Sequence, residues 1–138
     1  PGVILTLLSL MKSLKIGVIS DGLKIKQWEK LTYLGIQHFF DVVVINDLPS
    51  RWKPSEIGFK EALTKLKLID TTRIVYVGNK IDTEIIGANK MGMVSVLFDP
   101  LKKIDILNLD GDKKPNYIIH NFGKLNDIIG LKSIHWKF

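Results

Sequence analysis

Residues 73–98 read RIVYVGNKIDTEIIGANKMGMVSVLF, and this stretch decides the fold class. Continuous apolar runs at Arg73–Gly78 and Met93–Phe98 are typical of strands that are buried on both faces. Between them, apolar residues recur at helical spacing until Gly92 closes the helix. This order predicts two parallel strands that are joined by a right-handed crossover through a helix.

The same alternation of strands and helices extends to both ends of the chain. Further strands are predicted at Lys15–Ser20, Asp41–Asn46 and Tyr117–His120. Further helices are predicted at Val3–Leu14, Ile25–Leu34, Ile57–Leu66 and Phe122–Leu131, and a tail follows the last of them. The predicted fold is therefore α/β: a doubly wound, mostly parallel sheet with helices on both faces, in a single domain over residues 1–138.

The composition fits one folded domain and excludes several kinds of site. The chain has 138 residues, of which 46% are hydrophobic, and no cysteine. A disulfide scaffold, a thiolate zinc site and a cysteine nucleophile are therefore excluded. No apolar run approaches the roughly 18 residues of a membrane-spanning helix, and no signal peptide is recognisable. We expect a cytoplasmic protein with no membrane partner.

The net charge of +6 comes from lysines that are scattered along the chain. Of the 20 basic residues, Arg51 and Arg73 are the two arginines. Readout and stacking of nucleic acids favour arginine with interleaved aromatic residues. We therefore expect a solvated basic surface and no nucleic-acid partner.

Polar residues follow the first two predicted strands, where ligands bind in parallel sheets. Ser20, Asp21 and Gly22 combine a hydroxyl with a glycine turn, which can hold a phosphate oxygen together with backbone N–H groups. An ordinary capped turn has the same residues. Lys53 precedes Pro54, which restrains the Lys53 backbone, although such a pair also commonly opens a helix.

Acidic residues follow the third predicted strand. Asn79 comes directly after Gly78, and Asp82 and Glu84 lie at the start of the next helix. Their oxygens would suit magnesium. Acidic groups at this place also complement the helix macrodipole, so both interpretations stay open.

Together, three motifs in this order resemble the haloacid dehalogenase superfamily of aspartate-nucleophile phosphatases and dehalogenases. IGVISDG, with Ser20, resembles the family's second motif, and WKPSEIGFKEAL, with Lys53, resembles the third. VYVGNKIDTEIIGANKMGM resembles the fourth. The resemblance covers residues 1–100 and implies the Rossmann-like core of that family, whereas residues 101–138 are a less defined strand, helix and tail.

The resemblance implies a hydrolase, a phosphatase in preference to a dehalogenase, that acts on a small phosphorylated substrate. In such an enzyme an Asp forms an ester that water then releases. The implied catalytic residues are Ser20, which hydrogen-bonds the transferred group, and Lys53, which neutralises charge. The implied substrate-binding residues are Ser20, Asp21, Gly22 and Lys53, and the implied magnesium ligands are Asn79, Asp82 and Glu84.

The chain departs from the family pattern in two ways. No Asp-x-Asp motif precedes Ser20, so the nucleophile strand would be missing between the strands that end at Ser20 and Gly78. We expect the chain alone to be inactive and to need an upstream segment or a second chain to complete the sheet. In addition, Asn79 stands where the family has Asp, which would weaken magnesium binding.

Two alternatives to a phosphatase remain open. Asn at this position also occurs in the metal-independent branch of the family, so a 2-haloacid dehalogenase relative is one alternative. A non-catalytic relative that binds a phosphate or a partner is the other, because Asn79 and the short length favour it. A nucleotide-binding domain is disfavoured, since neither a G-x-G-x-x-G turn nor a P-loop follows a strand.

Overall fold

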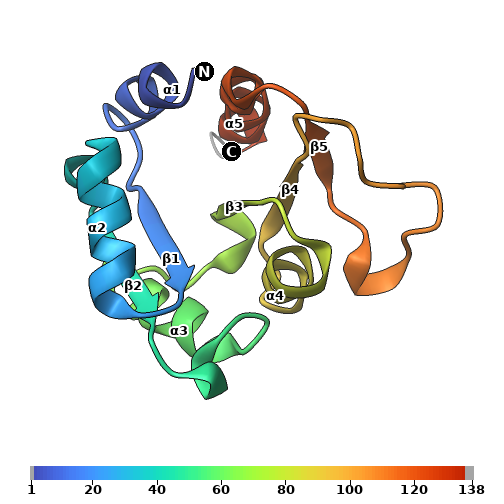
Figure 1. The fold of residues 1–138 in the computed structure, drawn as a ribbon. Coiled ribbons are helices and arrows are strands. Elements are labelled where there is room, and N and C mark those ends of the chain that lie inside the picture. The colour runs from blue at the N-terminus through green and yellow to red at the C-terminus, as the bar shows by residue number, and fades with distance from the viewer. Residues whose placement is uncertain (1, 136–138) are drawn as a thin grey trace. The chain divides into compact units, whose positions relative to one another are not determined.

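The computed structural model describes residues 2–135, with side chains described as far as Gly130. The chain divides into two compact units (Figure 1). The amino-terminal unit comprises Leu7–Ile69, and the carboxyl-terminal unit comprises residues 70–135 together with residues 2–6. The opening helix α1 (Val3–Leu10) has residues in both units. None of the described helices combines the length and the apolar character that a membrane crossing requires.

The amino-terminal unit is built on two parallel strands with two helices. Its elements are β1 (Gly17–Asp21), α2 (Lys24–Leu34), β2 (Val42–Asn46) and α3 (Glu56–Leu66). The register places Asp21 opposite Asn46, so both strands end at the same level. Helix α3 packs against this pair, and its Ala62 and Leu66 join a core with Val42 and Val44.

The carboxyl-terminal unit holds a three-stranded parallel sheet in the order β3-β4-β5. Its strands are β3 (Val75–Gly78), β4 (Val94–Phe98) and β5 (Tyr117–Ile119), and its helices are α4 (Ile86–Lys90) and α5 (Leu125–His135). The central strand β4 is covered on both faces, and Val96 and Leu97 are 0% exposed. This burial explains why the sequence of β4 is continuously apolar instead of alternating.

The predicted strands and the α/β class are confirmed, with differences at the helix ends. The opening helix ends at Leu10 and not at Leu14. The helix after β3 begins with a π-helical turn over Ile81–Ile85. The last helix continues to His135, into the predicted tail, and the rest of that tail lies outside the described residues.

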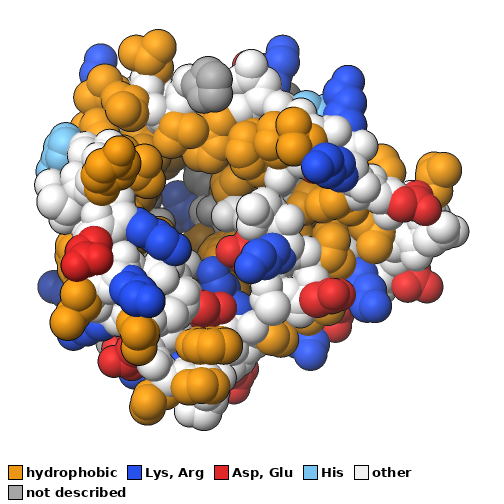
Figure 2. Space-filling model, in the orientation of Figure 1, with side chains coloured by type: hydrophobic (Ala, Val, Ile, Leu, Met, Phe, Trp, Pro, Cys, Tyr) orange, Lys and Arg blue, Asp and Glu red, His pale blue; other side chains and the backbone are white. Residues whose placement is uncertain are grey.

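The five strands of the described residues pair as two hydrogen-bonded sheets, β1-β2 and β3-β4-β5. The missing strand that the sequence predicts between the strands that end at Ser20 and Gly78 stays a prediction. The single domain over residues 1–138 stays a prediction. On the face shown in Figure 2, lysine and arginine side chains are spread among acidic and hydrophobic ones, as their scatter in the sequence predicts.

Candidate functional site

The first group of predicted site residues lies at the carboxyl end of β1. Ser20 and Asp21 are the last residues of the strand, and Gly22 turns the chain toward α2 with a φ of 131°. Residues with a Cβ rarely adopt this backbone conformation, whereas glycine adopts it readily. A Cβ on Gly22 would also lie 2.6 Å from Nε2 of Gln27, the end of a flexible side chain, so the backbone conformation is what requires glycine here.

The Ser20 hydroxyl has a partner within the unit. It donates to Oε1 of Gln27 on α2 at 2.6 Å. The hydroxyl has one proton, so a phosphate that accepts from Ser20 would compete with Gln27 for it. Nothing in the sequence pattern singles out Gln27, because its role depends on how the turn folds α2 back over the end of β1.

Lys53 is buried and is held at both ends. Its side chain ammonium donates to the carbonyl of Ile19, in β1, at 3.0 Å. Its backbone N–H faces both carboxylate oxygens of Asp21, at 3.1 and 3.3 Å. The residue is 7% exposed, which is rare for a lysine. The structure thus places Lys53 against Ile19 and Asp21, the two neighbours of Ser20 in β1, within the cluster that the sequence predicts.

Asn46, another residue at a predicted strand end, is a further member of this cluster, although the sequence assigned it no role. It ends β2, is 0% exposed, and donates from Nδ2 to Oδ1 of Asp21 at 2.8 Å. Its carbonyl accepts the N–H of Gly22 at 3.0 Å, so the amide of Gly22 is engaged within the protein. The sequence shows Asn46 as the last residue of an apolar strand, and only the register reveals that it faces Asp21.

The second group of predicted residues lies after β3, in the carboxyl-terminal unit. Oε2 of Glu84 accepts the backbone N–H groups of Asn79 at 2.7 Å and Lys80 at 3.2 Å. A Cβ on Gly78 would lie 2.5 Å from the same oxygen, so the carboxylate packs directly on the turn. The side chains of Asn79 and Asp82 are exposed.

The residues predicted to bind magnesium are partly engaged within the protein. Oxygen ligands are the right chemistry for magnesium, but one oxygen of Glu84 already serves two backbone amides. Within residues 2–130, whose side chains are described, no group of three or more His, Asp or Glu side chains is arranged to hold a metal ion. Magnesium binding by Asn79, Asp82 and Glu84 therefore stays a prediction, and no chemical step is derived from it.

A third carboxylate, Asp99, lies just beyond β4 and also serves the backbone. Its Oδ2 accepts the N–H of Ile104 at 3.0 Å, and its Oδ1 accepts that of Lys103 at 3.1 Å. The hydrogen bond from Ile104 is the main reason why the pKa of Asp99 lies below its ordinary value of 3.8. Burial acts in the opposite direction and raises this pKa. The Lys103 N–H and the charges of His120 and Lys103 lower the pKa further. Asp99 therefore stabilises the loop after β4.

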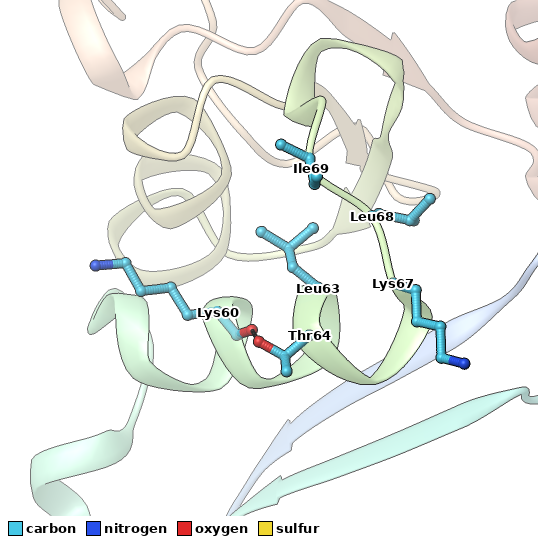
Figure 3. Close-up of a pocket in the computed structure, with 6 residues that line it drawn as sticks. All are labelled: Lys60, Leu63, Thr64, Lys67, Leu68 and Ile69. Carbon is cyan, nitrogen blue, oxygen red and sulfur yellow. Dashed lines mark hydrogen bonds between the residues drawn. The ribbon is translucent and has the colours of Figure 1, made fainter.

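A shallow groove of about 500 Å³ lies on α3 and the turn after it (Figure 3). Its lining residues are Lys60, Leu63, Thr64, Lys67, Leu68 and Ile69. The amines of Lys60 and Lys67 point away from each other in Figure 3 and do not converge on one ligand. No predicted site residue lines this groove, so we place the candidate site at the ends of β1 and β2.

Comparisons with known proteins bear on this cluster. Residues 1–98 match the family model of the haloacid dehalogenase-like hydrolases. The glyceraldehyde 3-phosphate phosphatase of Methanopyrus kandleri is 39% identical over 130 residues, which are 94% of this chain and 55% of that protein. The enzyme of the same name from Methanothermobacter thermautotrophicus is 48% identical over 86 residues, 62% of this chain and 38% of that protein.

A solved structure gives the same result at the level of the fold. The 2-haloacid dehalogenase from Pseudomonas syringae pv. Tomato matches with a TM-score of 0.80 and 29% identity, over 95% of this chain and 53% of that one. The chain spans about half the length of the proteins it matches. The family match covers most of the chain, including all three motifs. The chain belongs to the haloacid dehalogenase-like hydrolase family.

Proposed function

We propose that this chain supplies the phosphate-binding part of a phosphatase that acts on a small phosphorylated substrate. The observation that carries the proposal is the buried Lys53, whose ammonium is held on the carbonyl of Ile19, the residue before Ser20 in β1. A buried cation and a hydroxyl donor on the same strand suit a phosphoryl group, because both interact most strongly with the charge that develops during transfer. Curated relatives are named as phosphatases of glyceraldehyde 3-phosphate, which supports this substrate class.

Each residue of the cluster has a defined part in this proposal. Lys53 neutralises the charge of the bound phosphoryl group, and Ser20 donates its hydroxyl to a phosphoryl oxygen once that hydroxyl turns from Gln27. Asp21 and Gly22, also predicted to bind substrate, shape the turn that presents Ser20. The side chain of Asp21 accepts hydrogen bonds inside the unit, so any direct contact with phosphate comes from its main chain.

The nucleophile has to come from elsewhere. The family resemblance implies an Asp-x-Asp motif, and none precedes Ser20 in this sequence. We propose that a segment or chain beyond residues 1–138 supplies this Asp, and that residues 1–138 alone bind phosphate without turnover. Magnesium would need further oxygen ligands in addition to Asn79, Asp82 and Glu84, and a magnesium titration that follows the NMR signals of Asn79 tests this. A cytoplasmic location stays a prediction.

One observation favours an alternative. Asn79 carries no charge, and the Glu84 carboxylate already serves the turn after β3, so this part of the chain lacks a strong metal ligand set. A metal-independent 2-haloacid dehalogenase relative, or a non-catalytic phosphate- or partner-binding protein, would have the same arrangement. Binding of phosphate analogues, compared with binding of 2-haloacids, distinguishes these alternatives.

The test is a titration of the 138-residue chain with orthovanadate, a phosphate analogue, followed by NMR to tens of millimolar. We expect Lys53→Ala to weaken binding at least about tenfold, because it removes a charged hydrogen-bond donor. We expect Ser20→Ala to weaken it about threefold, the effect of one neutral hydrogen bond.

Lys60→Ala is the matched control for this titration. Lys60 is an exposed lysine on α3 that pairs with Glu56 at 2.8 Å, so its removal should leave the affinity unchanged. If both Lys53→Ala and Ser20→Ala bind vanadate like the wild type, the site assignment is wrong. If 2-chloropropionate binds in place of vanadate and depends on Lys53, the dehalogenase alternative is correct.

A further inference from the structure

The carboxylate of Asp21 faces inward, toward Lys53. Both of its oxygens lie within 3.3 Å of the Lys53 backbone N–H, and Oδ1 also accepts from Asn46. A carboxylate has no proton to donate to a phosphate, and its negative charge would repel a phosphate nearby. Direct recognition of an anion therefore does not explain why Asp21 lies in this cluster.

The orientation of Asn46 shows what its amide serves. Oδ1 of Asn46 is buried and has no hydrogen-bond partner among the described residues, whereas Nδ2 donates to Asp21. Reversing the amide would place Oδ1 against the carboxylate, so the observed assignment is the favourable one. The amide packs directly on Gly58, where an added Cβ would lie 2.5 Å from Oδ1, and Asn46 is 0% exposed. A buried, closely packed amide thus fixes the direction of the Asp21 carboxylate.

Lys53 depends on that carboxylate for its place. The loop between β2 and α3 carries Lys53, and Asp21 attaches it to the end of β1 through the Lys53 backbone N–H. The ammonium then reaches the carbonyl of Ile19 in the same strand. A lysine side chain is long and flexible, so the position of its charge depends on how firmly its backbone is held.

We propose that Asp21 and Asn46 are positioning residues that hold Lys53 against the end of β1, and that neither binds the substrate through its side chain. This inference rests on the proposed function, because phosphate is taken as the ligand of Lys53. A positioning role and a purely electrostatic role of Asp21 predict opposite changes in anion affinity when its charge is removed. If Asp21 were only a negative neighbour of the anion, its neutralisation would strengthen anion binding.

The first experiment uses that sign. Asp21→Asn has nearly the same shape but only one acceptor oxygen, and it cannot serve Asn46 and Lys53 as the carboxylate does. We expect it to weaken orthovanadate binding about fivefold, although it removes a negative charge. The matched control is Asp47→Asn, which removes the same charge from an exposed residue next to Asn46. The control should leave the affinity unchanged or strengthen it slightly.

The second experiment asks whether Asp21 acts through Lys53. In the Lys53→Ala background, Asp21→Asn should no longer weaken vanadate binding, because the residue that it positions lacks the ammonium. A merely structural role would lower the affinity in both backgrounds. Asn46→Ala should behave like Asp21→Asn in the wild-type background, and thermal unfolding of each variant shows whether it is folded.

The third experiment needs no ligand, so it separates this inference from the proposed function. The rate at which the Lys53 amine reacts with acetic anhydride is measured by mass spectrometry, with the exposed lysines of the same chain as internal standards. Release of the loop in Asp21→Asn should raise this rate several-fold for Lys53 alone, and Asp47→Asn should not.

The outcomes are distinct. A wild-type chain that does not bind vanadate overturns the proposed function, while the acetylation rates still decide the positioning role. If Asp21→Asn binds vanadate as tightly as Asp47→Asn and leaves the Lys53 acetylation rate unchanged, the positioning role is wrong. Weaker binding together with faster acetylation of Lys53 supports it.

Discussion

The strand ends of the two units hold charged side chains of opposite sign through the same kind of contact. At β1, the Lys53 ammonium donates to the carbonyl of Ile19. At β3, the Glu84 carboxylate accepts the amides of Asn79 and Lys80. In each case the charged group satisfies backbone polar groups near the end of a strand. Charge at these positions therefore does not by itself indicate a ligand.

The surroundings of the two charges separate their roles. Lys53 is 7% exposed and its backbone N–H donates to the Asp21 carboxylate, which also accepts from the buried Asn46 amide. Glu84 is half-buried, and the Asn79 and Asp82 side chains near it in sequence are exposed. The first arrangement is a preformed polar cluster, whereas the second is a capped turn. Four predictions test this contrast, beginning with the largest expected effect.

Gly78→Ala should destabilise the carboxyl-terminal unit most. The added Cβ would lie 2.5 Å from Oε2 and 2.7 Å from Cβ of Glu84, so the capping carboxylate cannot keep its place. Overpacking and loss of the cap should together lower the free energy of unfolding by about 2–3 kcal/mol, measured by urea denaturation. Gly130→Ala, in the open surroundings of α5, is the control and should be neutral or stabilising. Equal effects of the two substitutions would show that Glu84 does not cap the turn.

Gly58→Ala is the corresponding change in the amino-terminal unit. Its Cβ would lie 2.5 and 2.7 Å from the amide atoms of Asn46, which is fully buried. Alanine gains up to about 1 kcal/mol in helix propensity at this position, so the net loss in the free energy of unfolding should be about 1–2 kcal/mol. Vanadate affinity should fall as well, because Asn46 holds Asp21. A loss of stability with unchanged affinity would separate Asn46 from the site.

Gln27→Ala should have a smaller effect, and it should raise the affinity for vanadate instead of lowering it. The Ser20 hydroxyl donates to Gln27 at 2.6 Å, so Gln27 competes with a phosphate for the one hydroxyl proton. Its removal should strengthen vanadate binding about twofold, measured by the same NMR titration. In the Ser20→Ala background the gain should disappear, and a gain that persists there would show that Gln27 does not act through Ser20.

Asp99 extends the contrast to the pH dependence of stability, where we expect the smallest effect. Its pKa is lowered in the folded state, chiefly by the N–H of Ile104, so its contribution is present above the ordinary value of 3.8 and is lost as the pH falls through the folded pKa. Asp99→Asn should therefore lose less stability than the wild type between about pH 6 and pH 3 in urea denaturation. Identical curves for the wild type and Asp99→Asn would contradict this.

The strand positions were predictable from the sequence because the strands are buried. A continuous apolar run such as Val94–Phe98 carries its own indication of burial, and each predicted strand appears within two residues of its expected ends. Lys53 was singled out because its Lys-Pro pair resembles the third motif of the family, and its role stays a prediction. These features depend on residues close together in the chain.

Asn46 and Gln27 could not be predicted because their roles depend on contacts across the fold. The partner of Asn46 is Asp21, 25 residues away in sequence, and the pairing follows from the register of β1 and β2. The cap by Glu84 was hidden for another reason. Acidic residues at a helix start fit a metal site, a macrodipole and a turn cap equally well, and the atoms that distinguish these roles belong to the backbone of Asn79 and Lys80.

Among the described residues β1 is paired with β2 alone, and this has a consequence for local opening. A two-stranded parallel sheet is only marginally stable by itself, whereas β4 is hydrogen-bonded to a strand on each side. The amide protons of β1 and β2 should therefore exchange with solvent sooner than those of β4. The strand that carries Ser20 and anchors Lys53 should thus open before β4 does. An anion bound there would slow that opening, so binding would be seen as slower exchange of the amide protons of β1 and β2.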